Sequence, residues 1–303
     1  MSTENSQSID IGIVQFYISH TCNLACPGCL SFNNFNISGH ELWEDNKETA
    51  RDWANVIRPE DFTVIGGEPL SNPDVDKWIT GLRNLFPDVS DFKVCTNGLL
   101  IDKHKHNIKK WWDLGVVLEV SAHTPEQYKK ILKDLKQLFA GLQVKRYTSE
   151  SIDIPEYYKD DYDEIFLLNG RPIVLIAEEF QFYEWGARNI TKDTVYLHNS
   201  NPKEAHSNCE IYDCHYIYKG ELYKCGTMVG AQELVKKYNL DERSRKLIRD
   251  YTPITPQDSD LKNKLENLTN NPIKQCSLCP SKTVDQPRPI LDTDIKKVSY
   301  SKT

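Results

Sequence analysis

The chain has 303 residues, of which 39% are hydrophobic and 27% are charged, and its formal net charge is -7. These values are typical of a globular protein, and no apolar run approaches the length of about 20 residues that a membrane-spanning helix requires. The negative charge argues against nucleic-acid binding, which draws on clustered lysine and arginine. We therefore expect a globular protein that binds neither nucleic acid nor a membrane.

The first residues carry no targeting signal. The segment MSTENSQSIDIG lacks the basic start and the apolar stretch of a secretory signal peptide. We expect a cytoplasmic protein whose cysteines do not form disulfides, since that compartment keeps thiols reduced. Residues 1–10 are expected to be flexible.

From residue 11 to about residue 150, strand patterns alternate with helix patterns. The expected strands are 11–19, 61–67, 91–98 and 116–124, and the expected helices are 41–57, 74–86, 104–115 and 125–142. This repeated order predicts parallel strands joined by helical crossovers, in an open sheet or a barrel. The last helix has Pro125 in its first turn, where the missing N–H is tolerated.

The pattern is weaker after residue 150. An apolar segment at 171–185 predicts one or two more strands, which would complete a partial barrel, and a helix is expected over 236–251. Five cysteines lie between residues 206 and 280. We therefore divide the chain into a core domain, a cysteine-rich module and a flexible tail, over 11–198, 199–285 and 286–303.

Unusual residues stand at the end of each of the four predicted strands. In chain order they are three clustered cysteines, then Gly66-Gly67-Glu68-Pro69, then Thr96-Asn97-Gly98, and finally Ser121-Ala122-His123. The carboxyl ends of parallel strands lie at one edge of a sheet or barrel, where reactive groups gather. We expect these segments to form one site.

The clustered cysteines are Cys22, Cys26 and Cys29, and three kinds of structure could explain their spacing. A helix would place them on one face, but Pro27-Gly28 breaks such a helix. A zinc site would need a fourth ligand nearby. An iron-sulfur site needs only these three thiolates if one iron of a cubane is left open.

The loop from Cys22 to Cys29, CNLACPGC, resembles the signature of the radical S-adenosylmethionine (radical SAM) enzymes, and Gly66-Gly67-Glu68-Pro69 resembles their GGE motif. The resemblance covers roughly residues 11–198 and implies a partial (β/α)6 TIM-like barrel. It also implies that the three cysteines hold a [4Fe-4S] cluster whose open iron is chelated by SAM. The GGE segment would contact the methionine part of SAM, and Asn97 and Ser121 would add further contacts.

One position departs from the family pattern. The residue before the third cysteine is usually aromatic and lies by the adenine of SAM, whereas this chain has Gly28 there. The adenine contact is therefore expected from the backbone or from Phe32.

The C-terminal cysteines resemble the auxiliary-cluster modules called SPASM and twitch domains. The resemblance rests on Cys209, Gly220, Cys225 and the pair Cys276-x2-Cys279, and the absence of any later cysteine favours the shorter twitch type. It implies a second [4Fe-4S] cluster held by these four cysteines, with Gly220 in a tight hairpin turn. A zinc ribbon built from the same four cysteines remains an alternative.

Two further cysteines have no assigned place in a cluster. Cys214 is interpreted as an alternative ligand, a hydrogen-atom donor or an inert residue. Cys95 lies within a predicted strand and is expected to be a small core residue.

The resemblance implies a radical SAM oxidoreductase that abstracts hydrogen from a small polar metabolite, such as a sugar or an aminocyclitol, or from a peptide side chain. The auxiliary cluster would accept the electron, and a flavodoxin or ferredoxin would supply reductant. Arg146 is a candidate base or carboxylate clamp. Two alternatives stay open: an activating enzyme that makes a glycyl radical on a partner protein, and a non-catalytic metal-binding protein with a zinc ribbon.

Overall fold

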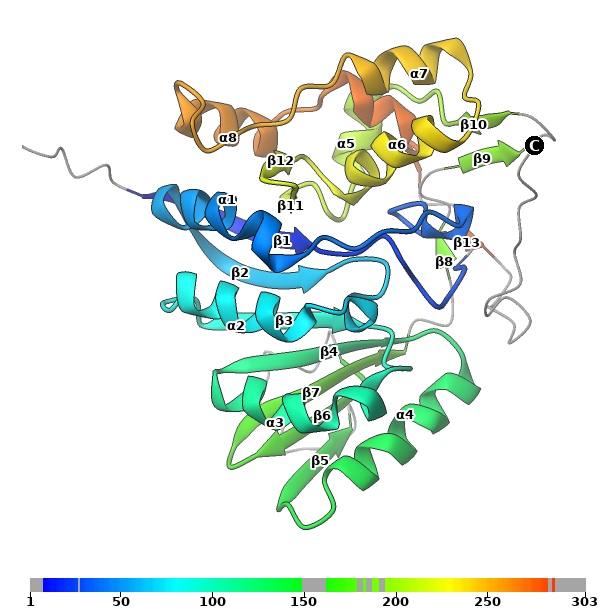
Figure 1. The fold of residues 1–303 in the computed structure, drawn as a ribbon. Coiled ribbons are helices and arrows are strands. Elements are labelled where there is room, and N and C mark those ends of the chain that lie inside the picture. Colours follow the sequence, from blue (N-terminus) through cyan, green and yellow to red (C-terminus); the bar gives the residue numbers. More distant parts are fainter. Residues whose placement is uncertain are drawn as a thin grey trace, which may run out of the picture.

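The N-terminal half of the chain alternates strands and helices as expected (Figure 1). The structure is a computed structural model that describes residues 8–26, 28–148, 162–178, 182–183, 187–190, 194–282 and 285–286. In this half the strands are β1 (Ile9–Tyr17), β2 (Ile57–Ile65), β3 (Asp91–Thr96) and β4 (Val116–Ala122). The helices are α1 (Trp43–Val56), α2 (Val75–Leu85), α3 (Lys105–Asp113) and α4 (Pro125–Leu138). All eight predicted elements are confirmed, with small differences at their ends.

The second half is less regular. Its strands are β5 (Val144–Thr148), β6 (Glu164–Leu168), β7 (Arg171–Glu178), β8 (Phe182–Tyr183), β9 (Ala187–Ile190), β10 (Val195–Leu197), β11 (Cys214–Tyr218), β12 (Glu221–Tyr223) and β13 (Asp285–Gln286). Its helices are α5 (Pro202–Ser207), α6 (Gly226–Lys237), α7 (Glu242–Arg249) and α8 (Leu261–Asn270). Short 3-10 helices are η1 (Asn33–Phe35), η2 (Pro69–Ser71), η3 (Ile101–His104) and η5 (Lys274–Leu278). The predicted tail, 286–303, lies outside the described residues except for its first residue.

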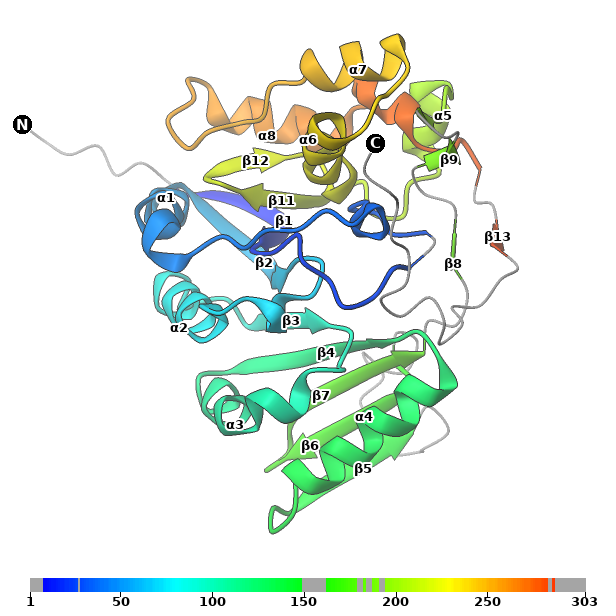
Figure 2. The same ribbon diagram turned by 45° about the vertical axis from the view of Figure 1, so that its right-hand side comes forward.

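One nine-stranded sheet runs through the molecule in the order β12-β11-β1-β2-β3-β4-β7-β6-β5 (Figure 2). The six neighbouring strands from β11 to β7 are parallel, and β12, β6 and β5 are antiparallel to the strands they join. The predicted α/β class with a mainly parallel sheet is thus confirmed. The carboxyl ends of β1 to β4 meet at one edge, as parallel strands require.

Helices α1 to α4 cover one face of this sheet (Figures 1 and 2). Each is amphipathic, so that its apolar stripe packs on the strands. In α2 the buried side chains recur at helical spacing and are those of Val75, Trp78, Ile79 and Leu82. Because side chains alternate along a strand, Val94 of β3 faces these helices and is fully buried, whereas its neighbour Cys95 is half-buried on the other face.

The sheet departs from simple strand-and-helix repetition after α4. β6 and β7 form an antiparallel hairpin closed by Asn169-Gly170, whose backbone φ values of 51° and 78° suit a two-residue turn. β7 then pairs in parallel with β4. The one or two strands predicted at 171–185 are therefore confirmed as β7 and β8. β7 follows β6 through a hairpin, and β8 pairs with β13 in a separate two-stranded sheet.

The helix predicted over 236–251 is confirmed only in its second part, as α7 (Glu242–Arg249). α6 ends at Lys237, and α7 begins anew after Asp241, whose side chain accepts a hydrogen bond from the Ser244 N–H at 3.0 Å. This N-cap starts a separate helix. Most of α6 is buried all round, so it lacks the amphipathic pattern by which a surface helix is recognised.

The C-terminal region is joined to the core through the same sheet. β11 pairs in parallel with β1, so residues beyond the predicted boundary near 199 extend the core sheet. The β11–β12 turn contains Gly220 at φ 78°, which confirms the predicted tight hairpin. Trp53 of α1, which is fully buried, donates its indole N–H to the Gly220 carbonyl at 2.9 Å. Among the described residues, no helix is long and apolar enough to cross a membrane.

Candidate functional site

The cysteine loop after β1 rests on the glycine-rich segment after β2. The Gly67 N–H donates to the Ser19 carbonyl at 2.6 Å, and the Glu68 N–H donates to the Thr21 carbonyl at 2.9 Å. The described residues of the loop form no helix, as expected, and its turn is closed by the Cys29 N–H donating to the Cys26 carbonyl at 3.1 Å. Two of the predicted segments are thus held together by backbone hydrogen bonds.

Glycine is required at this contact because the two backbones approach closely. A Cβ atom at Gly66 would lie 2.6 Å from the Ser19 carbonyl oxygen. At Gly67 it would lie 2.8 and 2.9 Å from the carbonyl oxygens of Thr21 and His20, and 3.0 Å from the Cys22 Cβ. The Gly-Gly pair therefore leaves room for the backbone that carries the first cysteine.

Glu68 has no exposed surface and links two strand ends. Its Oε1 accepts hydrogen bonds from the Leu70 N–H at 2.9 Å and the Thr96 hydroxyl at 2.7 Å, and its Oε2 accepts one from the Asn97 N–H at 2.8 Å. Burial raises the pKa of Glu68 to about 7, although these three hydrogen bonds oppose the shift. The carboxylate thus holds the ends of β2 and β3 at a fixed separation.

Replacing Glu68 by glutamine is expected to lower the free energy of unfolding by about 1–3 kcal/mol. The amide NH2 would face one of two backbone N–H donors, those of Leu70 and Asn97, because each carboxylate oxygen accepts one of them. Denaturant unfolding of the variant measures this loss. Glu48→Gln, on the exposed surface of α1, is the matched control. Equal unfolding midpoints for the two variants would contradict the prediction.

The third and fourth strand ends are tied to the same site. The Asn97 side-chain amide donates to the Asn23 side-chain oxygen at 2.6 Å, and Gln127 of α4 donates to the carbonyls of Asn97 and Ser121. The Gln127 side-chain oxygen accepts the His123 N–H at 3.0 Å. Gln127 was not predicted as a site residue, although Thr124-Pro125-Glu126-Gln127 has the spacing of a capping box.

Two half-buried cysteines of the loop accept hydrogen bonds from backbone donors. The Cys22 sulfur accepts the Leu24 N–H at 3.4 Å, and the Cys29 sulfur accepts the Asn33 N–H at 3.4 Å. Burial raises the pKa of Cys22 to about 12, with a further contribution from Glu68, and burial also raises the pKa of Cys29. Such N–H donors suit a thiolate that binds metal, and metal binding would displace the thiol protons.

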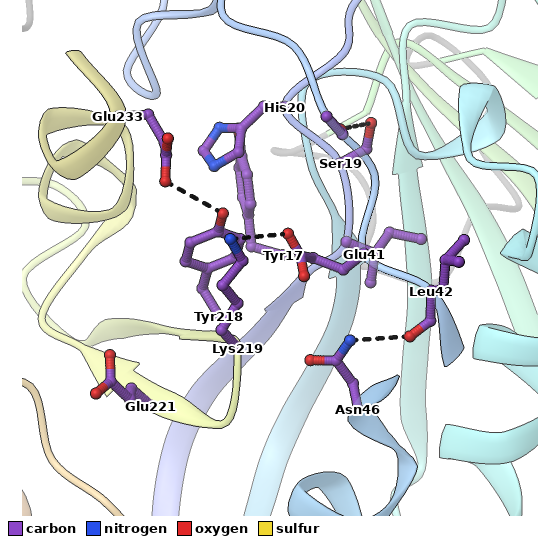
Figure 3. Close-up of polar contacts among 12 residues, drawn as sticks. Tyr17, Ser19, His20, Glu41, Leu42, Asn46, Tyr218, Lys219, Glu221 and Glu233 are labelled. Carbon is purple, nitrogen blue, oxygen red and sulfur yellow. Dashed lines mark hydrogen bonds and ion pairs between the residues drawn. The ribbon is translucent and has the colours of Figure 1, made fainter. Parts of the chain in front are cut away.

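The segment that leads into the cysteine loop also packs against the C-terminal region. Figure 3 shows the His20 ring beside Tyr17 and Tyr218, at centroid separations of 4.7 and 5.0 Å, with the Tyr218 hydroxyl directed at Glu233 of α6. His20 is 3% exposed, and burial lowers its pKa to about 4. His20 lies two residues before the first cysteine, so this buried aromatic contact joins the segment after β1 to β11 and α6.

Helix α6 approaches the segment after Cys29 just as closely. A Cβ atom at Gly230 would lie 2.3 Å from the Ser31 carbonyl oxygen, and one at Gly226 would lie 3.1 Å from the Ser31 hydroxyl. α6 begins directly after Cys225. One helix therefore connects the N-terminal cysteine loop to the C-terminal cysteines.

The four C-terminal cysteines line one cavity, although they come from separate segments. Cys209 follows α5, Cys225 precedes α6, and Cys276 and Cys279 belong to η5 and its end. Burial raises the pKa of each of these thiols. Among the described residues, no three His, Cys, Asp or Glu side chains are arranged to hold a single metal ion.

Lys224 lines the same cavity, whereas Cys214 does not. Burial lowers the pKa of Lys224, and the thiolates of Cys276, Cys225 and Cys209 oppose that shift. Cys214 is buried at the start of β11, opposite Ile13 of β1.

One family model matches the segment that carries the N-terminal cysteine loop. Residues 16–146 match the family model of the radical SAM superfamily, and this segment contains all three clustered cysteines and the GGE motif. This segment is a radical SAM domain. The predicted resemblance to the radical SAM superfamily is confirmed for this segment, and members of the superfamily use a [4Fe-4S] cluster and SAM.

Curated relatives match part of the chain. A protein named GTP 3',8-cyclase from Alkaliphilus metalliredigens (strain QYMF) is 28% identical over 142 residues, which cover 44% of this chain and 42% of that protein. A probable GTP 3',8-cyclase from Methanococcus aeolicus is 29% identical over 128 residues, covering 40% and 41%. The chain therefore matches less than half the length of these relatives.

Solved structures show only distant likeness to the chain. The crystal structure of BtrN in complex with AdoMet and 2-DOIA has a TM-score of 0.44 and 11% identity, covering 92% of this chain and 100% of that one. Streptococcus suis SuiB bound to S-adenosylmethionine has a TM-score of 0.37 and 14% identity, covering 88% and 67%. At these scores neither structure informs the reaction of this chain.

Three other residues do not take the places predicted for them. Arg146 is on β5, at the far edge of the sheet, where its guanidinium pairs with Glu164 of β6, so it is not brought together with the cysteine loop. Phe32 is 1% exposed in an apolar cluster and packs against Phe35, which removes it as an adenine contact. Cys95 is half-buried rather than a core residue, because it lies on the face of β3 opposite the helices.

Proposed function

We propose that the chain is a radical SAM oxidoreductase in which Cys22, Cys26 and Cys29 bind a [4Fe-4S] cluster whose open iron binds SAM. One observation carries the proposal: the cysteine loop is fixed by backbone hydrogen bonds to the Gly-Gly-Glu segment at the strand ends. The missing side chain at Gly67 leaves room for the backbone of Cys22. The N–H groups that donate to the sulfur atoms of Cys22 and Cys29 suit thiolates that bind a cluster. The fourth iron, without a cysteine, is the open position that SAM needs.

We assign the binding of SAM to residues around the cysteine loop. Gly66 and Gly67 approach the backbone of the cysteine loop closely, Glu68 fixes this segment through its buried carboxylate, and Pro69 directly follows Glu68. Asn97 reaches the loop through Asn23. Ser121 is connected to the same network through Gln127. We assign contacts with SAM to these groups and a positioning role to the Glu68 side chain.

The proposed chemistry balances as a two-electron oxidation of the substrate. SAM takes one electron and yields methionine and a 5'-deoxyadenosyl radical, and this radical takes a hydrogen atom from a substrate C–H bond. The substrate radical then loses one proton and one electron. We propose a small polar metabolite or a peptide side chain as substrate and a flavodoxin or ferredoxin as the source of the first electron.

The second electron needs an acceptor, which we assign to the C-terminal cavity. Cys209, Cys225, Cys276 and Cys279 line that cavity together, and four thiolates complete a [4Fe-4S] cluster with no open iron. Helix α6 connects Cys225 to the segment after Cys29. Cys214, which lies outside the cavity lining, is proposed to be inert.

Iron and zinc analysis after anaerobic reconstitution tests the second cluster. The wild-type chain is expected to bind about eight irons, and Cys276→Ala about four, with cleavage of SAM to 5'-deoxyadenosine retained in the variant. The variant keeps SAM cleavage because its radical SAM site is intact. About four irons together with one zinc in the wild type would show a zinc site and would remove the auxiliary cluster from the proposal.

The likeness to GTP 3',8-cyclases supports the SAM-dependent part of this proposal only. It covers less than half of each protein. We therefore do not assign a cyclase reaction or a nucleotide substrate to this chain.

A further inference from the structure

The described chain buries two lysine side chains whose surroundings differ. Lys93 is 7% exposed, and its ammonium lies 2.9, 3.0 and 3.6 Å from the carboxylates of Asp61, Asp91 and Glu119. Lys224 is 3% exposed, and among the described residues no carboxylate lies within 4.0 Å of its ammonium. A buried ammonium without a negative partner is strongly unfavourable. Lys224 therefore has no direct ion-pair partner among the described residues, and Asp213 and the thiolates of Cys276, Cys225 and Cys209 act on it at longer range.

Backbone oxygens satisfy only part of the Lys224 ammonium. Its Nζ donates to the Leu268 carbonyl and, at 3.4 Å, to the Tyr212 carbonyl. An ammonium has three N–H donors, so these two carbonyls leave one donor and the whole positive charge to be matched. Lys224 lines the cavity together with the four cysteines, which is where a negative group can meet it.

The backbone around Lys224 holds this side chain in place. The Lys224 N–H donates to the Tyr251 hydroxyl at 2.9 Å. The Lys224 carbonyl contacts the Nδ1 of His215 at 3.0 Å, and His215 has no exposed surface. The lysine is thus fixed between β12 and α6, next to Cys225 in sequence.

We infer that Lys224 is a built-in counter-charge for the auxiliary cluster and that it raises the reduction potential of that cluster. The inference rests on the proposed function, because it takes the group bound by the four thiolates to be a [4Fe-4S] cluster. Reduction adds one negative charge to a group that is already anionic, and a nearby ammonium in a buried cavity stabilises the reduced form more than the oxidised form. Lys224 would thereby favour transfer of the substrate's second electron to this cluster.

The test is redox titration of the auxiliary cluster in the full-length chain, followed by EPR spectroscopy. Its signal is assigned by comparison with Cys276→Ala, which lacks this cluster. Lys224→Met, which keeps length but removes the charge, is expected to lower the equilibrium constant for reduction at least tenfold, a shift of about 59 mV to more negative potential. Lys224→Arg is expected to restore most of the wild-type value. Lys236→Met, an exposed lysine of α6, is the matched control and is expected to leave the potential unchanged.

Each outcome separates this inference from the proposed function. Uptake of both clusters by Lys224→Met with an unchanged potential overturns the role of Lys224 and leaves the auxiliary cluster in place. Loss of the second cluster in Lys224→Met but not in Lys224→Arg supports a requirement for charge. Loss in both variants indicates packing alone and overturns the inference. A wild-type chain with one cluster and zinc contradicts the proposed function itself.

Discussion

Replacing Cys22 by alanine is expected to abolish the formation of 5'-deoxyadenosine from SAM. In the proposed function three thiolates hold three irons of the cluster, and the loss of one leaves the cluster without a stable site. The iron content is expected to fall from about eight to about four per chain, because the proposed auxiliary cluster uses other cysteines. The measurement is 5'-deoxyadenosine production with dithionite and SAM under anaerobic conditions, together with iron analysis.

Cys95→Ala is the matched control for this experiment. Cys95 is also a half-buried cysteine, and it is not part of either cysteine set. The control is expected to keep about eight irons and wild-type cleavage of SAM. Wild-type cleavage by Cys22→Ala would show that the loop does not form the reactive cluster.

Gly67→Ala is expected to lower SAM cleavage at least about tenfold and to reduce occupancy of the first cluster. Its Cβ would lie 2.8 and 2.9 Å from two backbone carbonyl oxygens and 3.0 Å from the Cys22 Cβ. Backbone at this position cannot move away as a flexible side chain would, since the Gly67 and Glu68 N–H groups are bonded to the same loop. Overpacking of this kind costs about 1–3 kcal/mol. Here the strain would be relieved by displacing the backbone that carries Cys22.

Gly12→Ala, in β1, is the control, because a Cβ there meets nothing within 4 Å. It is expected to leave iron content and SAM cleavage unchanged. If Gly67→Ala and Gly12→Ala behaved alike, close packing of the glycine segment on the cysteine loop would not be a requirement for activity.

The sequence allowed the segments of the candidate site to be predicted together because they follow successive parallel strands. Cys22, Gly67, Asn97 and Ser121 come from different strand ends, and the parallel order brings them to one edge of the sheet. The role of Glu68 within the site was not accessible in the same way. Its carboxylate is consumed by internal hydrogen bonds, which depend on the separation of two strand ends rather than on local sequence.

The elements that were missed are those fixed by tertiary packing. Helix α6 is mostly buried all round, and its two glycines are needed for contact with Ser31, so neither periodicity nor helix propensity identifies it. The hairpin between β6 and β7 had a usable signal, because Asn169-Gly170 between apolar residues is typical of a two-residue turn. Arg146 was proposed without a spatial argument. It lies on β5, the terminal strand of the sheet, which is separated from β1 by five other strands, and its guanidinium pairs with Glu164.

The wild-type assay for SAM cleavage tests the central claim most directly. The chain, reconstituted anaerobically with iron and sulfide and given dithionite and SAM, is expected to form 5'-deoxyadenosine and methionine in equal amounts. About eight irons per chain, with about four in Cys22→Ala, establish that the site at Cys22, Cys26 and Cys29 is filled in the same preparation. Absence of 5'-deoxyadenosine from a sample with that cluster intact would contradict the assignment of this chain as a SAM-cleaving enzyme.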